Sequence, residues 1–114
     1  MRLRLFPAAV PLAIFLMMAG CKSSHVDVTV ENRTGAPVRL LEVDYPNASF
    51  GADVLATGTQ MHYRIQVQGN GPVKVQYTAT NNKQTQATGP ELRQDQRGTM
   101  QIVLLPEAKV TFQE

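Results

Sequence analysis

The feature that most constrains the fold is an alternation of apolar and polar residues with a period of two. It begins at about His25, where Val26, Val28 and Val30 are separated by polar residues, and it recurs to the end of the chain. Successive side chains of a strand point to opposite faces, so this period indicates strands that are buried on one face. No helical period appears in this region, and residues 25–114 are therefore expected to be all-β.

Turn residues divide the alternating region into short segments. The turn sequences include Asn32-Arg33-Thr34-Gly35, Gly69-Asn70-Gly71-Pro72 and Pro106-Glu107-Ala108, and the second of these is expected to close a hairpin. The expected strands cover residues 26–31, 38–45, 54–55, 60–68, 73–79, 84–88, 100–105 and 110–112. Short strands repeated about every 8–12 residues predict one small antiparallel β-sandwich of about seven strands. The architecture resembles the immunoglobulin class, without its paired cysteines and tryptophan.

Three local features refine this prediction. Leu40 and Leu41 interrupt the alternation by one residue, which predicts a β-bulge in the second strand. Gly89-Pro90 is expected to end the polar strand that begins at Gln84. Residues 100–105 are apolar on both faces, and this pattern predicts a central or well-covered strand.

The first residues differ from the rest of the chain. Arg2 and Arg4 form a short basic start, an uncharged apolar run follows from Leu5 to Met18, and small residues precede Cys21. The run is about 14 residues, whereas a membrane-spanning helix needs about 20. This arrangement is typical of a cleaved export signal rather than a permanent membrane span.

Met18-Ala19-Gly20-Cys21 resembles the lipobox of bacterial lipoproteins. The resemblance implies cleavage before Cys21 and attachment of diacylglycerol to its thiol. The expected organisation is a signal peptide over 1–20, a lipidated cysteine with a short tether over 21–24, and a sandwich domain over 25–114. Lys22 is not the Asp that retains many lipoproteins in the inner membrane. The resemblance therefore implies an outer-membrane protein facing the periplasm if the source is Gram-negative.

The mature region carries no net charge. The chain has 11 Lys and Arg and 9 Asp and Glu, and removal of Arg2 and Arg4 with the signal leaves nine of each sign (11 − 2 = 9). A neutral domain lacks the basic surface that nucleic-acid binding requires. The expected partners are the membrane, through lipid on Cys21, and an envelope protein, with no nucleic acid. The sequence assigns no oligomeric state.

The sequence contains no pattern that predicts catalysis, a metal site or a cofactor. His25 and His62 are isolated, whereas zinc needs three or four converging ligands. Glu42 and Asp44 share a strand face at about 7 Å, but so small a sandwich offers no expected cleft for carboxylate chemistry. We therefore expect a non-enzymatic protein without a cofactor.

The remaining candidate site is the segment Tyr45–Gly51, which contains Tyr45, Pro46 and Phe50. Interpreted as a loop between strands, it presents Tyr45 and Phe50 either to a binding partner or as a plug for the end of the core. The mature region resembles small β-sandwich lipoproteins without an assigned activity. The expected function is a membrane-anchored binding or structural module that contacts another envelope component. The alternative function is a periplasmic carrier of a small ligand or metal.

Overall fold

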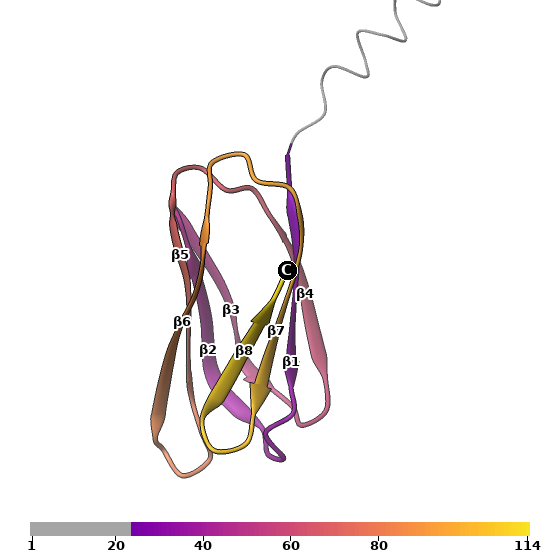
Figure 1. Cartoon of the computed structure of the whole chain (residues 1–114). Coiled ribbons are helices and arrows are strands. Elements are labelled where there is room, and N and C mark those ends of the chain that lie inside the picture. Colours follow the sequence, from indigo (N-terminus) through magenta and orange to yellow (C-terminus); the bar gives the residue numbers. More distant parts are fainter. Residues whose placement is uncertain (1–23) are drawn as a thin grey trace, which may run out of the picture.

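The computed structural model describes residues 24–114, which form two four-stranded β-sheets packed face to face (Figure 1). The predicted β-sandwich is confirmed, with eight strands instead of about seven. No helix within residues 24–114 is long and apolar enough to cross a membrane. The strands are β1 (Val26–Asn32), β2 (Val38–Tyr45), β3 (Ala48–Leu55), β4 (Gln60–Ile65), β5 (Gly71–Thr78), β6 (Gln84–Leu92), β7 (Gly98–Leu105) and β8 (Lys109–Gln113).

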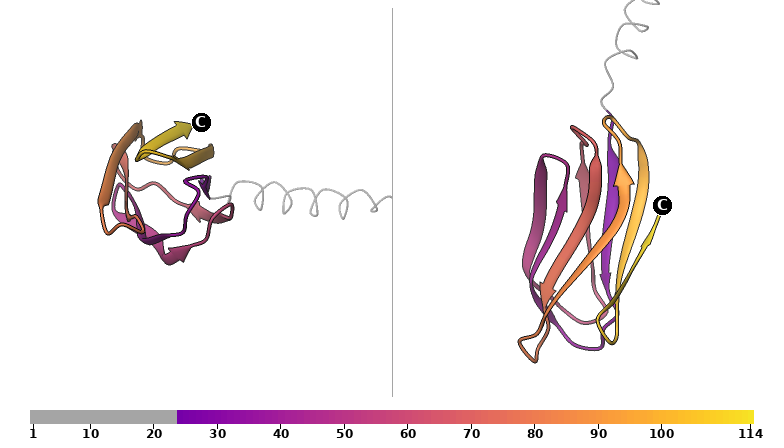
Figure 2. Two further views of the ribbon diagram at one scale, coloured as in Figure 1. Left: turned by 90° about the horizontal axis from the view of Figure 1, so that it is seen from below. Right: turned by 60° about the vertical axis from the view of Figure 1, so that its left-hand side comes forward.

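The two sheets have the strand orders β4-β1-β7-β8 and β3-β2-β5-β6. All neighbouring strands are antiparallel except β1 and β7, which are parallel, with Val26 beside Gly98 and Asn32 beside Leu104. The expectation of a purely antiparallel sandwich is corrected at this pair, because an alternating pattern contains no information about strand direction. Figure 2 shows β6 and β8, which belong to different sheets, side by side at one margin of the sandwich.

The core lies between the sheets and consists mainly of branched aliphatic side chains. Because each fully buried Val, Leu or Ile side chain contributes about 1.5–3 kcal/mol, this layer dominates the stability of the domain. The central strand β7 buries Ile102, Val103 and Leu104, which confirms the prediction for residues 100–105. The other core residues include Val26, Val28, Val30, Val38, Leu41, Val43, Ile65, Val67, Val73, Val75 and Leu92.

The predicted β-bulge in β2 is confirmed. The pairing of β2 with β5 shifts between Arg39 and Glu42, and Leu40 has a φ of 52°. The shift allows both Val38 and Leu41 to face the core, although they are three positions apart. It also leaves Leu40 59% exposed on the outside of the sandwich.

The expected loop over residues 45–51 is wrong, because β2 and β3 form a tight hairpin there. Tyr45 pairs with Ala48, so that Pro46 and Asn47 alone make the turn. Proline favours the first central position of a type II turn, and Asn47 occupies the second with a φ of 76°. The small residues that follow Asn47 conceal the period of β3 in the sequence.

Two further sequence expectations are corrected. Gly69-Asn70-Gly71-Pro72 does not close a hairpin, because β4 pairs with β1 in one sheet and β5 with β2 and β6 in the other. The segment is a crossover between sheets.

Gly89-Pro90 does not end β6, which continues to Leu92 with a shift in its pairing to β5. Because β6 is an edge strand, it tolerates a proline that has no amide hydrogen to donate.

Candidate functional site

Cys21 lies outside the described residues, as do the rest of the predicted lipobox and signal peptide. The first described residues are held against the β6–β7 connection. Arg97 Nε donates to Ser24 Oγ at 3.1 Å, and the Gly98 amide donates to the His25 carbonyl at 3.2 Å. Ser24 therefore lies at the upper end of the sandwich in Figure 1, where β1 begins.

A pocket of about 480 Å³ opens at the opposite end of the sandwich. Three connections surround it, β1–β2, β5–β6 and β7–β8, which lie together at the lower end in Figure 1. We call it the end pocket. Its lining residues are Thr34, Ala36, Pro37, Val38, Tyr77, Ala79, Thr80, Asn81, Lys83, Gln84, Thr85, Leu105, Pro106, Glu107 and Ala108.

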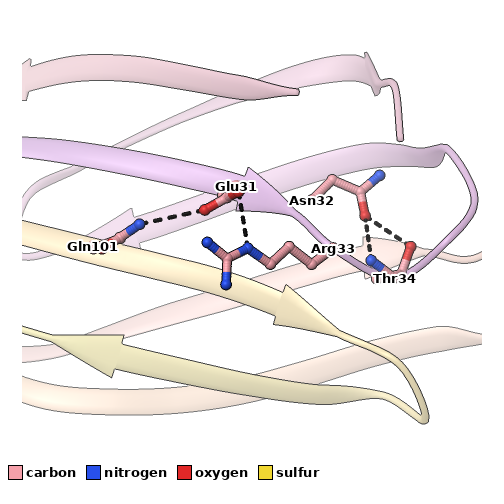
Figure 3. A network of polar contacts seen from close by, with 5 residues as sticks. All are labelled: Glu31, Asn32, Arg33, Thr34 and Gln101. Carbon is pink, nitrogen blue, oxygen red and sulfur yellow. Dashed lines mark hydrogen bonds and ion pairs between the residues drawn. The ribbon is translucent and has the colours of Figure 1, made fainter. Parts of the chain in front are cut away.

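Asn32 fixes the β1–β2 side of the end pocket. Its buried amide nitrogen donates to the carbonyl oxygens of Ala36 at 2.8 Å and Leu55 at 3.0 Å. Its Oδ1 accepts from the amide of Thr34 at 2.9 Å and from the Thr34 hydroxyl at 2.7 Å (Figure 3). The side chain therefore satisfies all of its polar atoms within the protein, and it holds Thr34 and Ala36 in place at the rim.

A short turn with several hydrogen bonds forms the β5–β6 side. The amide of Ala79 donates to the Lys83 carbonyl at 2.8 Å, and the amide of Lys83 donates to Asn81 Oδ1 at 3.0 Å. Arg39 Nη2 donates to Asn82 Oδ1 at 2.9 Å, which ties this turn to β2. Asn82 has a φ of 64°, a conformation that asparagine tolerates well.

The third side is the β7–β8 turn, where two consecutive non-glycine residues have left-handed backbones. Glu107 has a φ of 64° and Ala108 a φ of 60°. Such a conformation costs about 1–2 kcal/mol for each L-residue, and the paired strands on both sides maintain it. Together with the other two connections, this turn gives the end pocket a defined shape.

Tyr77 and Val38 form the apolar floor of the end pocket, and both are buried, with Tyr77 only 3% exposed. No hydrogen bond between the described residues involves the Tyr77 hydroxyl. No buried side-chain nitrogen or oxygen in residues 24–114 lacks a partner, so this hydroxyl is not sealed within the core. The hydroxyl therefore reaches the protein surface, and Tyr77 is one of the residues that line the end pocket.

The rim of the end pocket is electrically balanced. Lys83 and Glu107 are its only ionised lining residues, one of each sign. Just outside the pocket, Arg33 Nε contacts Glu31 Oε2 at 2.9 Å, and Gln101 Nε2 donates to Glu31 Oε1 at 3.4 Å (Figure 3). The hydrogen bond to Glu31, followed by the charge of that carboxylate, raises the pKa of Arg33.

The two aromatic residues predicted as candidate binding residues lie outside the end pocket. Phe50 is 7% exposed, and its ring stacks on Tyr63 with centroids 4.6 Å apart and an angle of 11° between the planes. The Tyr45 ring is 6.3 Å from Phe50 and packs against the core. Burial, and secondarily the charge of Tyr63, raises the pKa of Tyr45. The structure thus places Tyr45 and Phe50 in one aromatic cluster.

Charged groups on the outer faces of the sheets form two small clusters. On the outer face of the β4-β1-β7-β8 sheet, Asp27 Oδ1 contacts Arg64 Nε at 3.1 Å and His62 Nε2 at 3.9 Å. On the other sheet, Glu42 and Asp44 share the outer face of β2, and hydrogen bonding with Asp44, followed by its charge, raises the pKa of Glu42. No three His, Cys, Asp or Glu side chains in the part of the chain that the structure describes converge as metal ligands.

Comparison with known proteins identifies the fold and no family. No family model matches the chain, and no curated protein is similar to it. A solved NMR structure of a protein from Eubacterium rectale is similar, with a TM-score of 0.58 and 13% sequence identity. The match covers 79% of this chain and 87% of that one. At this identity the likeness supports the sandwich fold alone.

Proposed function

We propose that this protein is a lipid-anchored, non-catalytic binding module of the bacterial cell envelope. Lipid on Cys21 holds it on the membrane, facing the periplasm from the outer membrane if the source has one. The end pocket is the binding site, and its partner is another envelope component. The proposal rests on the lipobox-like sequence and on the position of the end pocket, which opens at the end of the sandwich away from Ser24.

The single observation that carries the binding role is the preformed shape of the end pocket. Hydrogen bonds of Asn32, Asn81 and Arg39 hold two of its three walls. Loops that are already ordered lose little entropy when a partner binds, so more of the contact energy appears as affinity. Small pockets of about 300–1,000 Å³ are typical ligand sites, and the volume of about 480 Å³ also favours the second candidate function, a small-ligand carrier.

Site-specific photo-crosslinking on native membranes tests the proposed site. A photoreactive residue replaces Lys83 at the rim of the end pocket in one variant and Gln94 in a control, on the exposed β6–β7 connection. We expect a discrete crosslinked envelope component from position 83 and none from position 94. Equal crosslinking from both positions, or none from position 83, would contradict the binding role of the end pocket.

Membrane attachment is tested separately with Cys21→Ala. We expect this variant to leave the membrane fraction, while the wild-type protein stays there through a high-salt wash, since acyl chains and not charges hold it. A variant that remains membrane-bound after the wash would refute the anchor. The control is Ser23→Ala, which alters the tether and keeps the thiol.

A further inference from the structure

The hydroxyl of Tyr77 is a polar group on an otherwise apolar floor. Tyr77 is 3% exposed and packs in the core, it lines the end pocket, and no hydrogen bond between residues 24–114 involves its hydroxyl. A phenolic hydroxyl both donates and accepts one hydrogen bond or more. A ligand seated on this floor therefore meets one fixed hydrogen-bonding group at its inner end.

Two of the other polar side chains that line the pocket, Thr34 and Asn81, are engaged within the protein, whereas Thr80, Gln84 and Thr85 lie at its more exposed positions. The Thr34 hydroxyl donates its single proton to Asn32 Oδ1 at 2.7 Å, and its oxygen lies 2.8 Å from the Ala36 carbonyl oxygen. Asn81 Oδ1 accepts from the Lys83 amide at 3.0 Å. The walls between these groups are apolar, with Pro37, Val38 and Leu105 among them. Among the polar side chains that line the pocket, Tyr77 is the buried one, and its hydroxyl is therefore the hydrogen-bonding group that belongs to the pocket floor.

The charges at the rim of the end pocket indicate the net charge of its ligand. Lys83 and Glu107, both exposed, leave the rim without a net charge. A charged ligand would lose hydration on the apolar floor without gaining an opposite charge at depth, and this loss disfavours binding. A neutral ligand avoids that cost.

We infer that the end pocket binds a small neutral molecule with an apolar body and one terminal hydroxyl or carbonyl, which hydrogen-bonds to the Tyr77 hydroxyl. The apolar body packs against Val38, Pro37 and Leu105. This inference rests on the second candidate function of the end pocket, a small-ligand carrier, and adds the chemical class of the ligand.

A pair of matched probes tests the inference. p-Cresol and toluene have the same apolar body, and only p-cresol carries a hydroxyl. Each is titrated into the full-length protein in detergent micelles, with amide shifts followed by NMR and the free probe concentration corrected with a protein-free micelle blank. We expect p-cresol to shift the amides of Thr80 and Ala108, and toluene to bind about threefold to tenfold more weakly, because it lacks one hydrogen bond.

Two variants identify the hydroxyl responsible. Tyr77→Phe is expected to reduce p-cresol affinity to the level of toluene. Tyr63→Phe makes the same chemical change on the exposed edge of β4 and is expected to leave p-cresol affinity unchanged. Equal affinity of the two probes for the wild type, or shifts confined to another surface, would overturn the inference.

A third variant keeps the test decisive if Tyr77→Phe does not fold. Ala36→Leu adds side-chain volume at the pocket wall and is expected to abolish the p-cresol shifts, so unchanged shifts in this variant would also count against the inference. Crosslinking from position 83 together with failed p-cresol binding would reject the ligand class and retain the binding module. Loss of both would reject the two proposals together.

Discussion

The side-chain amide of Asn32 donates to the carbonyl of Leu55 at 3.0 Å, a bond that joins the end of β1 to the end of β3 across the two sheets. The same nitrogen reaches Ala36, and the Asn32 oxygen holds Thr34. One buried polar residue thus fastens the β1–β2 connection to the rest of the sandwich. The order of the end pocket depends on it.

Replacing Asn32 with Ala should lower the free energy of unfolding by about 2–4 kcal/mol, because it leaves buried carbonyl and amide groups without partners. Urea denaturation followed by circular dichroism measures this loss as a lower midpoint. Asn70→Ala is the matched control, since its side chain makes one exposed hydrogen bond, to the Gln94 amide. A similar small effect for both variants would show that the Asn32 network contributes little.

Replacing Leu40 with Gly should leave stability unchanged or raise it by up to about 1 kcal/mol. The left-handed φ of Leu40 strains an L-residue, glycine adopts it freely, and the exposed side chain contributes little burial. Val54→Gly, at an exposed strand position with no left-handed backbone, should instead destabilise by about 0.5–1 kcal/mol. Thermal denaturation of the two variants compares them directly. If Leu40→Gly destabilises as much as Val54→Gly, the side chain of Leu40 matters more than its backbone.

Adding a methyl group at Gly89 should destabilise the protein by about 1–3 kcal/mol through overpacking. A Cβ at this position would lie 2.6 Å from the Phe112 ring, closer than carbon atoms approach. Phe112→Leu replaces that ring with a smaller aliphatic side chain, so Gly89→Ala should cost less in a Phe112→Leu background. A double-mutant cycle on chemical denaturation measures this coupling. Strictly additive effects would mean that β6 and β8 do not pack at this contact.

The Glu42–Asp44 pair predicts an effect of acid on stability. The hydrogen bond to Asp44, followed by its charge, raises the pKa of Glu42 in the folded protein above its ordinary value of 4.5. The folded state therefore binds the proton more tightly than the unfolded state. The resulting stabilisation is fully present below about pH 4.5 and is lost as the pH rises through the raised pKa of Glu42.

Asp44→Asn should return the pKa of Glu42 toward its ordinary value, because it removes the neighbouring negative charge. An NMR titration of the Glu42 carboxyl carbon in the wild type and the variant measures this change. Asp53→Asn removes a carboxylate from β3 and should leave the titration of Glu42 unaltered. An identical Glu42 titration in the wild type and in Asp44→Asn would contradict the pairing.

The strands and the core could be predicted from the sequence because burial of one face leaves a period of two. Val26, Val28 and Val30 show this directly, and the break at Leu40–Leu41 identifies the bulge. Only residues 54–55 of β3 were predicted, because Ala48, Gly51 and Ala52 are too small to show alternating burial.

Sheet membership and the end pocket could not be predicted in this way. The sequence Gly69–Pro72 favours a tight turn, and only the pairing of distant strands shows that it crosses between sheets. The alternating pattern places Tyr77 on the buried face of its strand. This is correct for the ring, but the pattern contains no information about the hydroxyl. The one available signal was a tyrosine at a core position close to a turn.

The parallel pairing of β1 with β7 has a consequence for the order in which the molecule assembles. Glu31 and Gln101 contact each other although they are 70 positions apart in the chain. β1 therefore lacks its neighbour β7 until that strand has been synthesised, and the sheet that contains both strands is completed late. Contacts between such distant segments slow folding. The β4-β1-β7-β8 sheet thus stays incomplete until β7 is available to pair with β1.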